Sequence, residues 1–206
     1  MKDDKQPPLI VIAGPNASGK STITKRLKLR PDFPSIYINV DEMMEYEGLS
    51  DEKAWEKADR LRADALENRE PLAFETVLSN TDKIDFMKEA KKAGYCVSLY
   101  FICLQDPEMN VLRAQERCQD GKQSYITEDI VRDLYPKSIQ TLSIALPVAD
   151  EAMIYNNSWE NPELIARKTK DGKIHTYPLK EKDERSIWTK QKIEELIGVE
   201  SSQDES

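Results

Sequence analysis

The segment from Gly14 to Thr22, GPNASGKST, constrains this chain more than any other. It matches the phosphate-loop pattern G-x-x-x-x-G-K-[ST] in full and directly follows the apolar residues 9–13. In such a loop the glycines permit a tight turn whose N–H groups face phosphate oxygens. The sequence therefore predicts a site for a nucleoside triphosphate, formed by Gly14, Asn16, Ala17, Ser18, Gly19, Lys20, Ser21 and Thr22.

Two side chains of this loop have distinct chemical roles. Lys20 brings a positive charge to the β- and γ-phosphates, which makes it a candidate for catalysis as well as for binding. The hydroxyl of Ser21 is the candidate ligand for Mg²⁺. A helix is predicted to begin near Lys20 and to end before Pro31, and its positive N-terminal end adds to the anion site.

Apolar and amphipathic segments alternate along the rest of the chain. Strands are predicted at residues 9–13, 35–40, 72–78, 95–104 and 151–155. Helices are predicted at 51–69 and 80–93, after Asp106 and around Arg132, and a hairpin at 167–179. Strands alternating with helices around a phosphate loop predict an α/β fold of the P-loop NTPase type, with a doubly wound, mainly parallel sheet flanked by helices and a helical lid at about 113–137.

Two aromatic residues have simple interpretations. Trp55 lies on the apolar stripe of its predicted helix, with Ala58, Leu61 and Ala65, so we expect it to pack in the core. His175 is the single histidine of the chain, and its place in the predicted hairpin indicates a surface strand residue, not a catalytic base.

Length and charge limit the possible organisation and partners. A chain of 206 residues with 39% hydrophobic residues suits one domain, predicted at residues 8–198, with a flexible N-terminus at 1–7 and a disordered acidic tail at 199–206. The net charge of −8 argues against nucleic acid as a partner, whereas a small anion in a local basic cleft remains compatible.

The chain shows no signal peptide and no apolar run long enough to cross a membrane, so no membrane partner is expected. Its three cysteines, Cys96, Cys103 and Cys118, lack metal-binding spacing and are interpreted as free thiols in a reducing compartment. We therefore expect a cytoplasmic protein.

Two predicted strands carry polar residues where a ligand would bind. Asp41 follows the strand at 35–40, and ligands of open α/β sheets bind outside the carboxyl ends of strands. The alternative for Asp41 is a helix cap or a loop carboxylate. Glu75 and Thr76 lie within the apolar strand at 72–78, where a charge needs a polar cleft or a partner. A ligand contact is the favoured interpretation of Glu75, and a structural salt bridge is the alternative.

An arginine-bearing pair of helices flanks a polar loop. Arg113 and Arg117 are four residues apart on one predicted helix, and Arg132 lies on the next. The Asn-Lys-x-Asp pattern of GTPases is absent, as is a strand ending in Asp-Glu. The layout is typical of a small kinase, in which arginines close over the transferring phosphate. An exposed charged face is the alternative for Arg113 and Arg117.

At this point the sequence resembles the zeta toxin family of P-loop kinases, in particular its small stand-alone bacterial branch. The resemblance covers roughly residues 8 to 180 and rests on the phosphate loop, the Asp41 position, residues 74–79 (FETVLS), residues 90–95 (AKKAGY), the series Arg113, Arg117 and Gly121, and residues 154–158 (IYNNS). Residues 74–76 (FET) are its most specific element outside the loop.

The resemblance implies an activity and roles for the candidate residues. Studied members phosphorylate a hydroxyl of a UDP-activated amino sugar with ATP or GTP. Asp41 would then accept the proton of the acceptor, Glu75 and Thr76 would hold the sugar, and the lid arginines would bridge the phosphates. A protein inhibitor, or antitoxin, is a further partner that this family suggests.

This chain departs from the family pattern in its lid. Relatives usually have Gly-Gly-His where it has Gly121-Lys122-Gln123, and Arg-Arg where it has Asp133-Leu134. The family's later Asp-Asn-Ser is Asn156-Asn157-Ser158 here. These replacements leave Arg117 and Arg132 as the predicted lid arginines, with Lys137 as a substitute. They also indicate a different acceptor or a weaker activity.

The sequence thus predicts an Mg²⁺-dependent phosphotransferase that uses ATP or GTP on a hydroxyl of a small acceptor, with a UDP-N-acetyl amino sugar as one candidate. The alternative is a nucleotide-binding switch or slow NTPase that acts through a protein partner.

Overall fold

The computed structural model describes residues 6–119, 126–179 and 184–198. Its strands are β1 (Pro8–Ala13), β2 (Ile36–Ile38), β3 (Leu72–Thr76), β4 (Cys96–Cys103), β5 (Glu151–Asn156), β6 (Glu163–Lys168) and β7 (Ile174–Thr176). Its helices are α1 (Lys20–Leu27), α2 (Val40–Glu47), α3 (Asp51–Asn68), α4 (Asp82–Lys92), α5 (Pro107–Gln119), α6 (Glu128–Val148) and α7 (Glu184–Leu196). Each strand and helix expected from the sequence has a counterpart among these elements.

All seven strands form one sheet in the order β2-β3-β1-β4-β5-β6-β7. The first five strands run parallel, and β6 and β7 add an antiparallel hairpin at one edge. The central strand β1 is in register with both neighbours, so that Val11 lies opposite Phe74 and Leu99. The predicted α/β fold with a mainly parallel sheet is confirmed.

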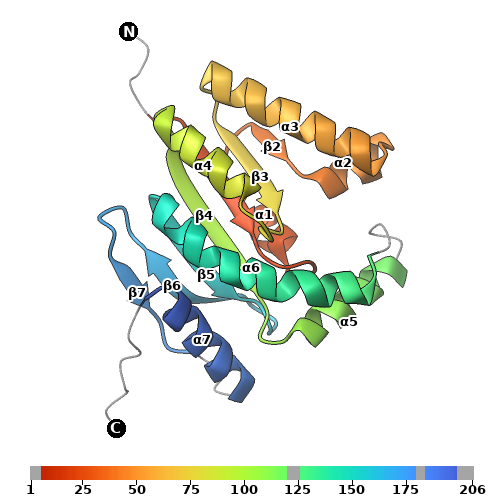
Figure 1. Cartoon of the computed structure of the whole chain (residues 1–206), viewed down its shortest axis with the longest axis vertical. Helices are drawn as coiled ribbons and strands as arrows, with labels where there is room; N and C mark the ends of the chain where they lie inside the picture. Colours follow the sequence, from red (N-terminus) through yellow and green to blue (C-terminus); the bar gives the residue numbers. More distant parts are fainter. Residues whose placement is uncertain (1–5, 120–125, 180–183, 199–206) are drawn as a thin grey trace.

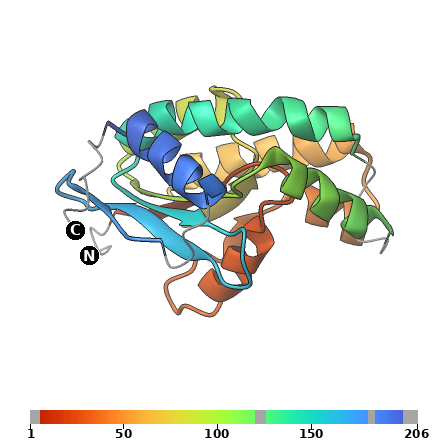
Figure 2. The same cartoon turned by 90° about the horizontal axis from the view of Figure 1, so that it is seen from below.

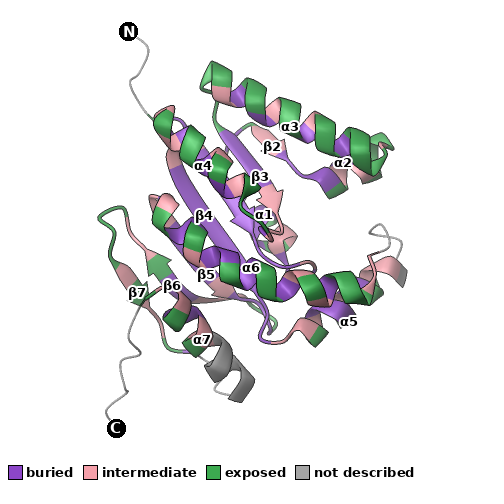
Figure 3. Ribbon diagram, in the orientation of Figure 1, coloured by how far each residue is buried: buried purple, intermediate pink, exposed green. Residues whose placement is uncertain are grey.

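Helices cover both faces of the sheet (Figures 1 and 2). On one face, α1 packs Ile23 and Leu27 in a cluster with Ile10, Ile12 and Ile102. On the other face, α3, α4, α6 and α7 enclose the larger core. Because both faces are covered, the central strands are buried along almost their whole length (Figure 3). Apolar side chains on both faces of a strand are the pattern expected of a parallel sheet.

The sequence analysis missed helix α2, and this changes the setting of Asp41. Strand β2 ends at Ile38, and Asn39 caps a helix that begins at Val40. The Asn39 Oδ1 atom accepts hydrogen bonds from the backbone N–H groups of Asp41 and Glu42, at 3.0 and 3.3 Å. Asp41 therefore lies in the first turn of a helix and not directly at the end of a strand.

The expectation that Trp55 packs in the core is wrong. Helix α3 buries Ala54, Ala58, Arg62 and Ala65, and it leaves Trp55 48% exposed. The buried stripe includes Arg62, whose guanidinium pairs with Asp59 and lies 5.5 Å from the ring centroid of Phe74. The buried side of α3 therefore includes Arg62, and Trp55 lies outside it.

Several expectations concern the ends of the chain and the cysteines. Residues 1–5, the tail 199–206 and the lid residues 120–125 lie outside the described residues. Pro7, in the predicted flexible N-terminus, is buried, and its carbonyl accepts a hydrogen bond from Cys96 N–H at 3.0 Å. Within the described ranges, the three cysteines form no disulfide, and no helix is long and apolar enough to cross a membrane.

The side chain of Asp150 links strand β4 to helix α4 through hydrogen bonds. Its carboxylate accepts hydrogen bonds from Val97 N–H and from Lys91 Nζ, both at 2.8 Å. Burial opposes the charged form, but these hydrogen bonds outweigh it and hold the pKa of Asp150 below its ordinary value. A carboxylate with a lowered pKa stabilises the fold above its unfolded pKa, and this contribution is lost as the pH falls through the folded pKa.

We therefore expect Asp150→Asn to lower the free energy of unfolding by about 1 kcal/mol near neutral pH, since the pair with Lys91 is partly exposed and screened. The deficit should shrink as the pH falls below about 4, because the wild-type carboxyl then becomes protonated as well. Urea unfolding at a series of pH values measures both effects. Asp133→Asn, which breaks the exposed pair with Lys137, is the control and should change stability by less than about 0.5 kcal/mol. A deficit that does not change with pH would contradict this role.

Candidate active site

The phosphate loop makes a tight turn between β1 and α1. Gly14, Ala17 and Gly19 all have positive φ angles, of 141°, 56° and 93°. A Cβ atom on Gly14 would lie 1.9 Å from the carbonyl oxygen of Ile102, and one on Gly19 would lie 2.0 Å from Asn157 Nδ2. Both positions therefore require glycine for two reasons, the backbone conformation and the lack of space.

Side chains of neighbouring elements hydrogen-bond to backbone carbonyls of this loop. Asn110 of α5 donates a hydrogen bond from Nδ2 to the carbonyl of Asn16 at 2.5 Å, and Asn157 donates from Nδ2 to the carbonyl of Ser18 at 2.9 Å. Arg113 in turn donates to the carbonyls of Asn157 and Ser158, at 3.0 and 3.3 Å. Arg113 thus fixes the segment after β5. From the sequence, a ligand contact and an exposed charged face were the two alternatives for this residue.

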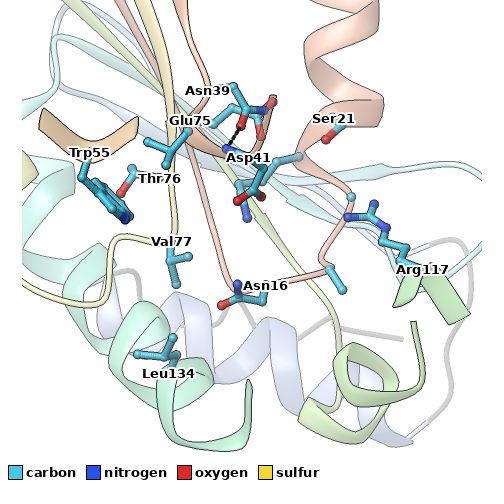
Figure 4. A pocket seen from close by; sticks show the side chains of 14 residues that line it. Asn16, Ser21, Asn39, Asp41, Trp55, Glu75, Thr76, Val77, Arg117 and Leu134 are labelled. Carbon is cyan, nitrogen blue, oxygen red and sulfur yellow. Dashed lines mark hydrogen bonds between the residues drawn. The ribbon is translucent and has the colours of Figure 1, made fainter. Parts of the chain in front are cut away.

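A cavity of about 230 Å³ opens at the carboxyl ends of β1 and β3 (Figure 4). Six of the side chains predicted to act on substrates line it, namely Lys20, Ser21, Asp41, Glu75, Thr76 and Arg117. They come from α1, α2, β3 and α5, so segments almost a hundred residues apart in the sequence meet in one site. The loop residues Asn16, Ala17 and Gly19 complete its floor.

Lys20 folds back on its own loop. Its Nζ atom donates hydrogen bonds to the carbonyls of Gly14 and Pro15, each at 3.0 Å. Burial lowers the pKa of Lys20, while the nearby carboxylates of Glu75 and Asp41 act in the opposite direction. A half-buried ammonium near two carboxylates is poised to bind an anion, because phosphate oxygens would replace the weaker carbonyl contacts.

The Asp41 carboxylate is exposed to the cavity and has no hydrogen-bond or ion-pair partner among the described residues. Its backbone is nevertheless fixed by the bond from its N–H to Asn39 Oδ1, drawn in Figure 4. The first turn of α2 also favours a negative charge at this position. Asp41 is therefore a positioned carboxylate with free oxygen atoms.

Glu75 is held by neutral donors. Its Oε1 atom accepts hydrogen bonds from Thr24 Oγ1 at 2.5 Å and from the Tyr37 hydroxyl at 2.8 Å. Burial, together with the charge of Glu75, raises the pKa of Tyr37, so its hydroxyl keeps the proton that it donates. No ion pair to Glu75 is found in the part of the chain that the structure describes. The structural salt bridge considered from the sequence is thus not the arrangement observed.

Asn39 connects these two carboxylates. Its Oδ1 caps the helix of Asp41, and its Nδ2 donates at 3.1 Å to the Tyr37 hydroxyl that holds Glu75. Sequence analysis missed Thr24, Tyr37 and Asn39. One signal was available, since Asn39 is followed three residues later by Glu42, which is the spacing of a helix-capping box. Nothing in the sequence indicates that Thr24 and Tyr37 reach Glu75.

The predicted lid cations separate into two groups. Arg117 lines the cavity. Arg132 does not, because its guanidinium binds both carboxylate oxygens of Glu108, at 2.7 and 2.9 Å, and pairs with Glu128 at 3.0 Å. These hydrogen bonds raise the pKa of Arg132. Lys137 pairs with Asp133 at 2.6 Å. A phosphate contact by Arg132 would require its ion pairs to open.

Comparison with known proteins identifies the family of this chain. The sequence profile of the Zeta toxin family matches residues 1–161. An uncharacterised protein of Haemophilus influenzae is 32% identical over 131 residues, which cover 61% of this chain and 91% of that protein.

Two solved structures share the fold. The first is the AvrRxo1-ORF1:-ORF2 complex with ATP, with a TM-score of 0.69 and 16% identity. The match covers 93% of this chain but only 64% of that one. The second comes from the PezAT chromosomal toxin–antitoxin system of Streptococcus pneumoniae, with a TM-score of 0.62, 16% identity, and coverage of 96% and 89%. With the family profile matching more than half of its length, the chain belongs to the zeta toxin family of P-loop kinases.

Proposed function

We propose that this protein transfers the γ-phosphoryl group of ATP or GTP to a hydroxyl of a small acceptor. The observation that carries the proposal is that the unpartnered carboxylate of Asp41 lines the same cavity as Lys20 and Ser21 of the phosphate loop. A carboxylate at this place can accept the proton of an acceptor hydroxyl, which is a step that a nucleotide switch does not carry out.

The loop suits the donor nucleotide. Its N–H groups and the N-terminal end of α1 attract phosphate oxygens, and Lys20 and Arg117 add two positive charges to the cavity. The side-chain oxygens of Asn16 and Ser18 are buried and have no hydrogen-bond partner among the described residues. Unpaired buried polar atoms are costly, so a ligand that accepts from the Ser18 hydroxyl or donates to Asn16 Oδ1 would stabilise the loop.

The residues of the cavity also suit Mg²⁺, which prefers oxygen ligands and is often held by one or two protein groups together with substrate phosphates. The Ser21 hydroxyl is the side-chain oxygen that would hold it. The ion would neutralise phosphate charge.

Asp41 would accept the proton of the acceptor hydroxyl, as the family resemblance suggests. General-base help of this kind contributes about 10²- to 10⁴-fold to a rate. Glu75 and Thr76 would bind the acceptor, with Glu75 held in place by Tyr37 and Thr24. In this arrangement, Asp41 of α2 is the base, Glu75 of β3 binds the acceptor, and the phosphate loop binds the donor nucleotide.

Family membership suggests further partners. The first acceptor to test is a UDP-N-acetyl amino sugar, the class that the resemblance names. Since the similar structures include a toxin–antitoxin system and the AvrRxo1-ORF1:-ORF2 complex, we also propose a protein inhibitor for this chain. The competing function is a nucleotide switch or slow NTPase that acts through a protein partner.

One experiment separates these functions. The protein is incubated with Mg²⁺ and ATP or GTP labelled in the γ-phosphate, first with the UDP-sugar and then with a metabolite extract. A labelled phosphate ester is the expected product. Free labelled phosphate alone, with a rate that a protein partner increases, would instead support the switch.

Lys20→Ala should abolish tight binding of ATP, because it removes the charge that faces the β- and γ-phosphates. Calorimetric titration measures the affinity. Lys137→Ala is the matched control, since that lysine pairs with Asp133 outside the cavity and its loss should leave ATP binding unchanged. Equal affinity in the Lys20 variant and the wild type would contradict the loop as the donor site.

Asp41→Asn and Glu75→Gln should affect different kinetic parameters. Asp41→Asn removes the base but keeps the shape, so kcat should fall by about 10²-fold or more with nucleotide binding preserved. Glu75→Gln should mainly raise the KM for the acceptor. Steady-state kinetics with the acceptor identified above measures both, and Glu45→Gln on the exposed side of α2 is the control. If both site variants transfer phosphate like the wild type, the proposed roles are wrong.

Arg117→Ala should lower kcat by about 10²- to 10³-fold, the cost typical of removing one donor to a developing charge. Arg132→Ala is the matched control, because it removes another arginine of the predicted lid. Since Arg132 forms ion pairs with Glu108 and Glu128, we expect a much smaller loss of kcat in this variant. Turnover rates at saturating ATP measure the difference. An equal loss in the two variants would mean that the ion pairs of Arg132 open during turnover and that both arginines act on phosphate.

A further inference from the structure

Trp55 is an unusual residue in the wall of this cavity. Its side chain lines the same space as Lys20 and Asp41, and it is 48% exposed. The indole is also held in place. Lys83 of α4 places its ammonium 5.9 Å from the ring centroid, and Asp59 pairs with that ammonium at 3.4 Å. A large aromatic surface is therefore kept exposed inside the cavity instead of folding into the core.

The surroundings of Trp55 make one end of the cavity apolar. Val77 and Leu134 line it together with the indole. In Figure 4, Trp55 lies on the side of Glu75 and Thr76, whereas Ser21 and Arg117 lie on the other side. Position 134 is also one where the family resemblance leads us to expect an arginine. The end away from the donor phosphates thus combines an apolar wall with two hydrogen-bonding side chains.

We propose that Trp55 is a stacking platform for a planar, uncharged ring carried by the acceptor, with Val77 and Leu134 contacting the edge of that ring. The assignment of this ring to the acceptor rests on the proposed function, whereas the stacking on Trp55 does not. Trp55 is then a specificity-determining residue, because an acceptor without a planar ring would cover less of the flat indole surface. Glu75 and Thr76 would bind the polar part of the same molecule.

Stacking of a ring on an aromatic side chain commonly changes binding by about 5- to 100-fold when the aromatic residue is removed. The effect depends on contact area and not on charge, so it should be insensitive to salt. It should also be largely retained when Phe replaces Trp, and lost when Leu replaces it.

The test measures binding and does not need turnover. The protein is titrated by ligand-observed NMR with four probes: uridine, adenosine, phenyl β-glucoside and glucose. Each titration is made with Mg²⁺ and saturating ADP, so that the donor site is filled, and again without ADP. The same titrations are made with Trp55→Phe, Trp55→Leu and Trp159→Leu. Trp159 is the matched control, because it is 36% exposed but does not line the cavity. Leu134→Asn gives a second variant of the same wall.

We expect at least one ring-bearing probe to bind more tightly than glucose. Trp55→Leu should weaken that probe by about 5- to 100-fold, and Leu134→Asn should weaken it to a smaller degree. Trp55→Phe should retain most of the affinity, and Trp159→Leu should have no effect. Melting temperatures of the variants show whether each one is folded.

Three results would overturn the proposal. The first is that no ring-bearing probe binds better than glucose. The second is that Trp55→Leu binds the probes like the wild type. The third is that ring binding disappears whenever ADP is present, which would assign the ring to the donor base. Failure of the kinase proposal has a different signature, since Trp55-dependent binding would then persist although no phosphate ester forms.

Discussion

The close contact between the phosphate loop and the ends of the neighbouring strands is the constraint on which the site depends. Gly14 lies against the backbone of Ile102 in β4, and Gly19 lies against the side chain of Asn157, just after β5. Arg113 fixes that same segment through two carbonyls. The loop is therefore shaped by three elements that are distant in sequence, so the donor site exists only when the sheet is assembled.

A second set of contacts couples the two carboxylates of the cavity, Asp41 and Glu75. Asn39 uses one end of its amide to cap α2, which carries Asp41, and the other end to bind the Tyr37 hydroxyl, which holds Glu75. An amide is well suited to this task, because it offers an acceptor and a donor at once. Among the described residues, the Asp41 carboxylate has no partner and Glu75 has neutral donors, so a salt bridge occupies neither carboxylate.

The charge distribution matches the proposed chemistry. The chain carries a net charge of −8, but Lys20, Arg117 and the start of α1 make the donor side of the cavity locally positive. Other cations that the sequence offered are occupied elsewhere, as Arg132 is by Glu108 and Glu128. A basic residue in a predicted lid thus takes part in the site only if its acidic neighbours leave it free.

The sequence by itself determined the alternation of strands and helices, the donor site and the family, because the phosphate loop and the apolar periodicity are local patterns. It also marked Asp41, Glu75 and Arg117, which follow or belong to recognisable elements. Only the tertiary structure decided that Trp55 faces the cavity, that Arg113 braces a loop and that Arg132 is paired outward. These outcomes depend on contacts between elements that are distant in the sequence, such as that of Arg62 in α3 with Phe74 in β3, and no single segment encodes them.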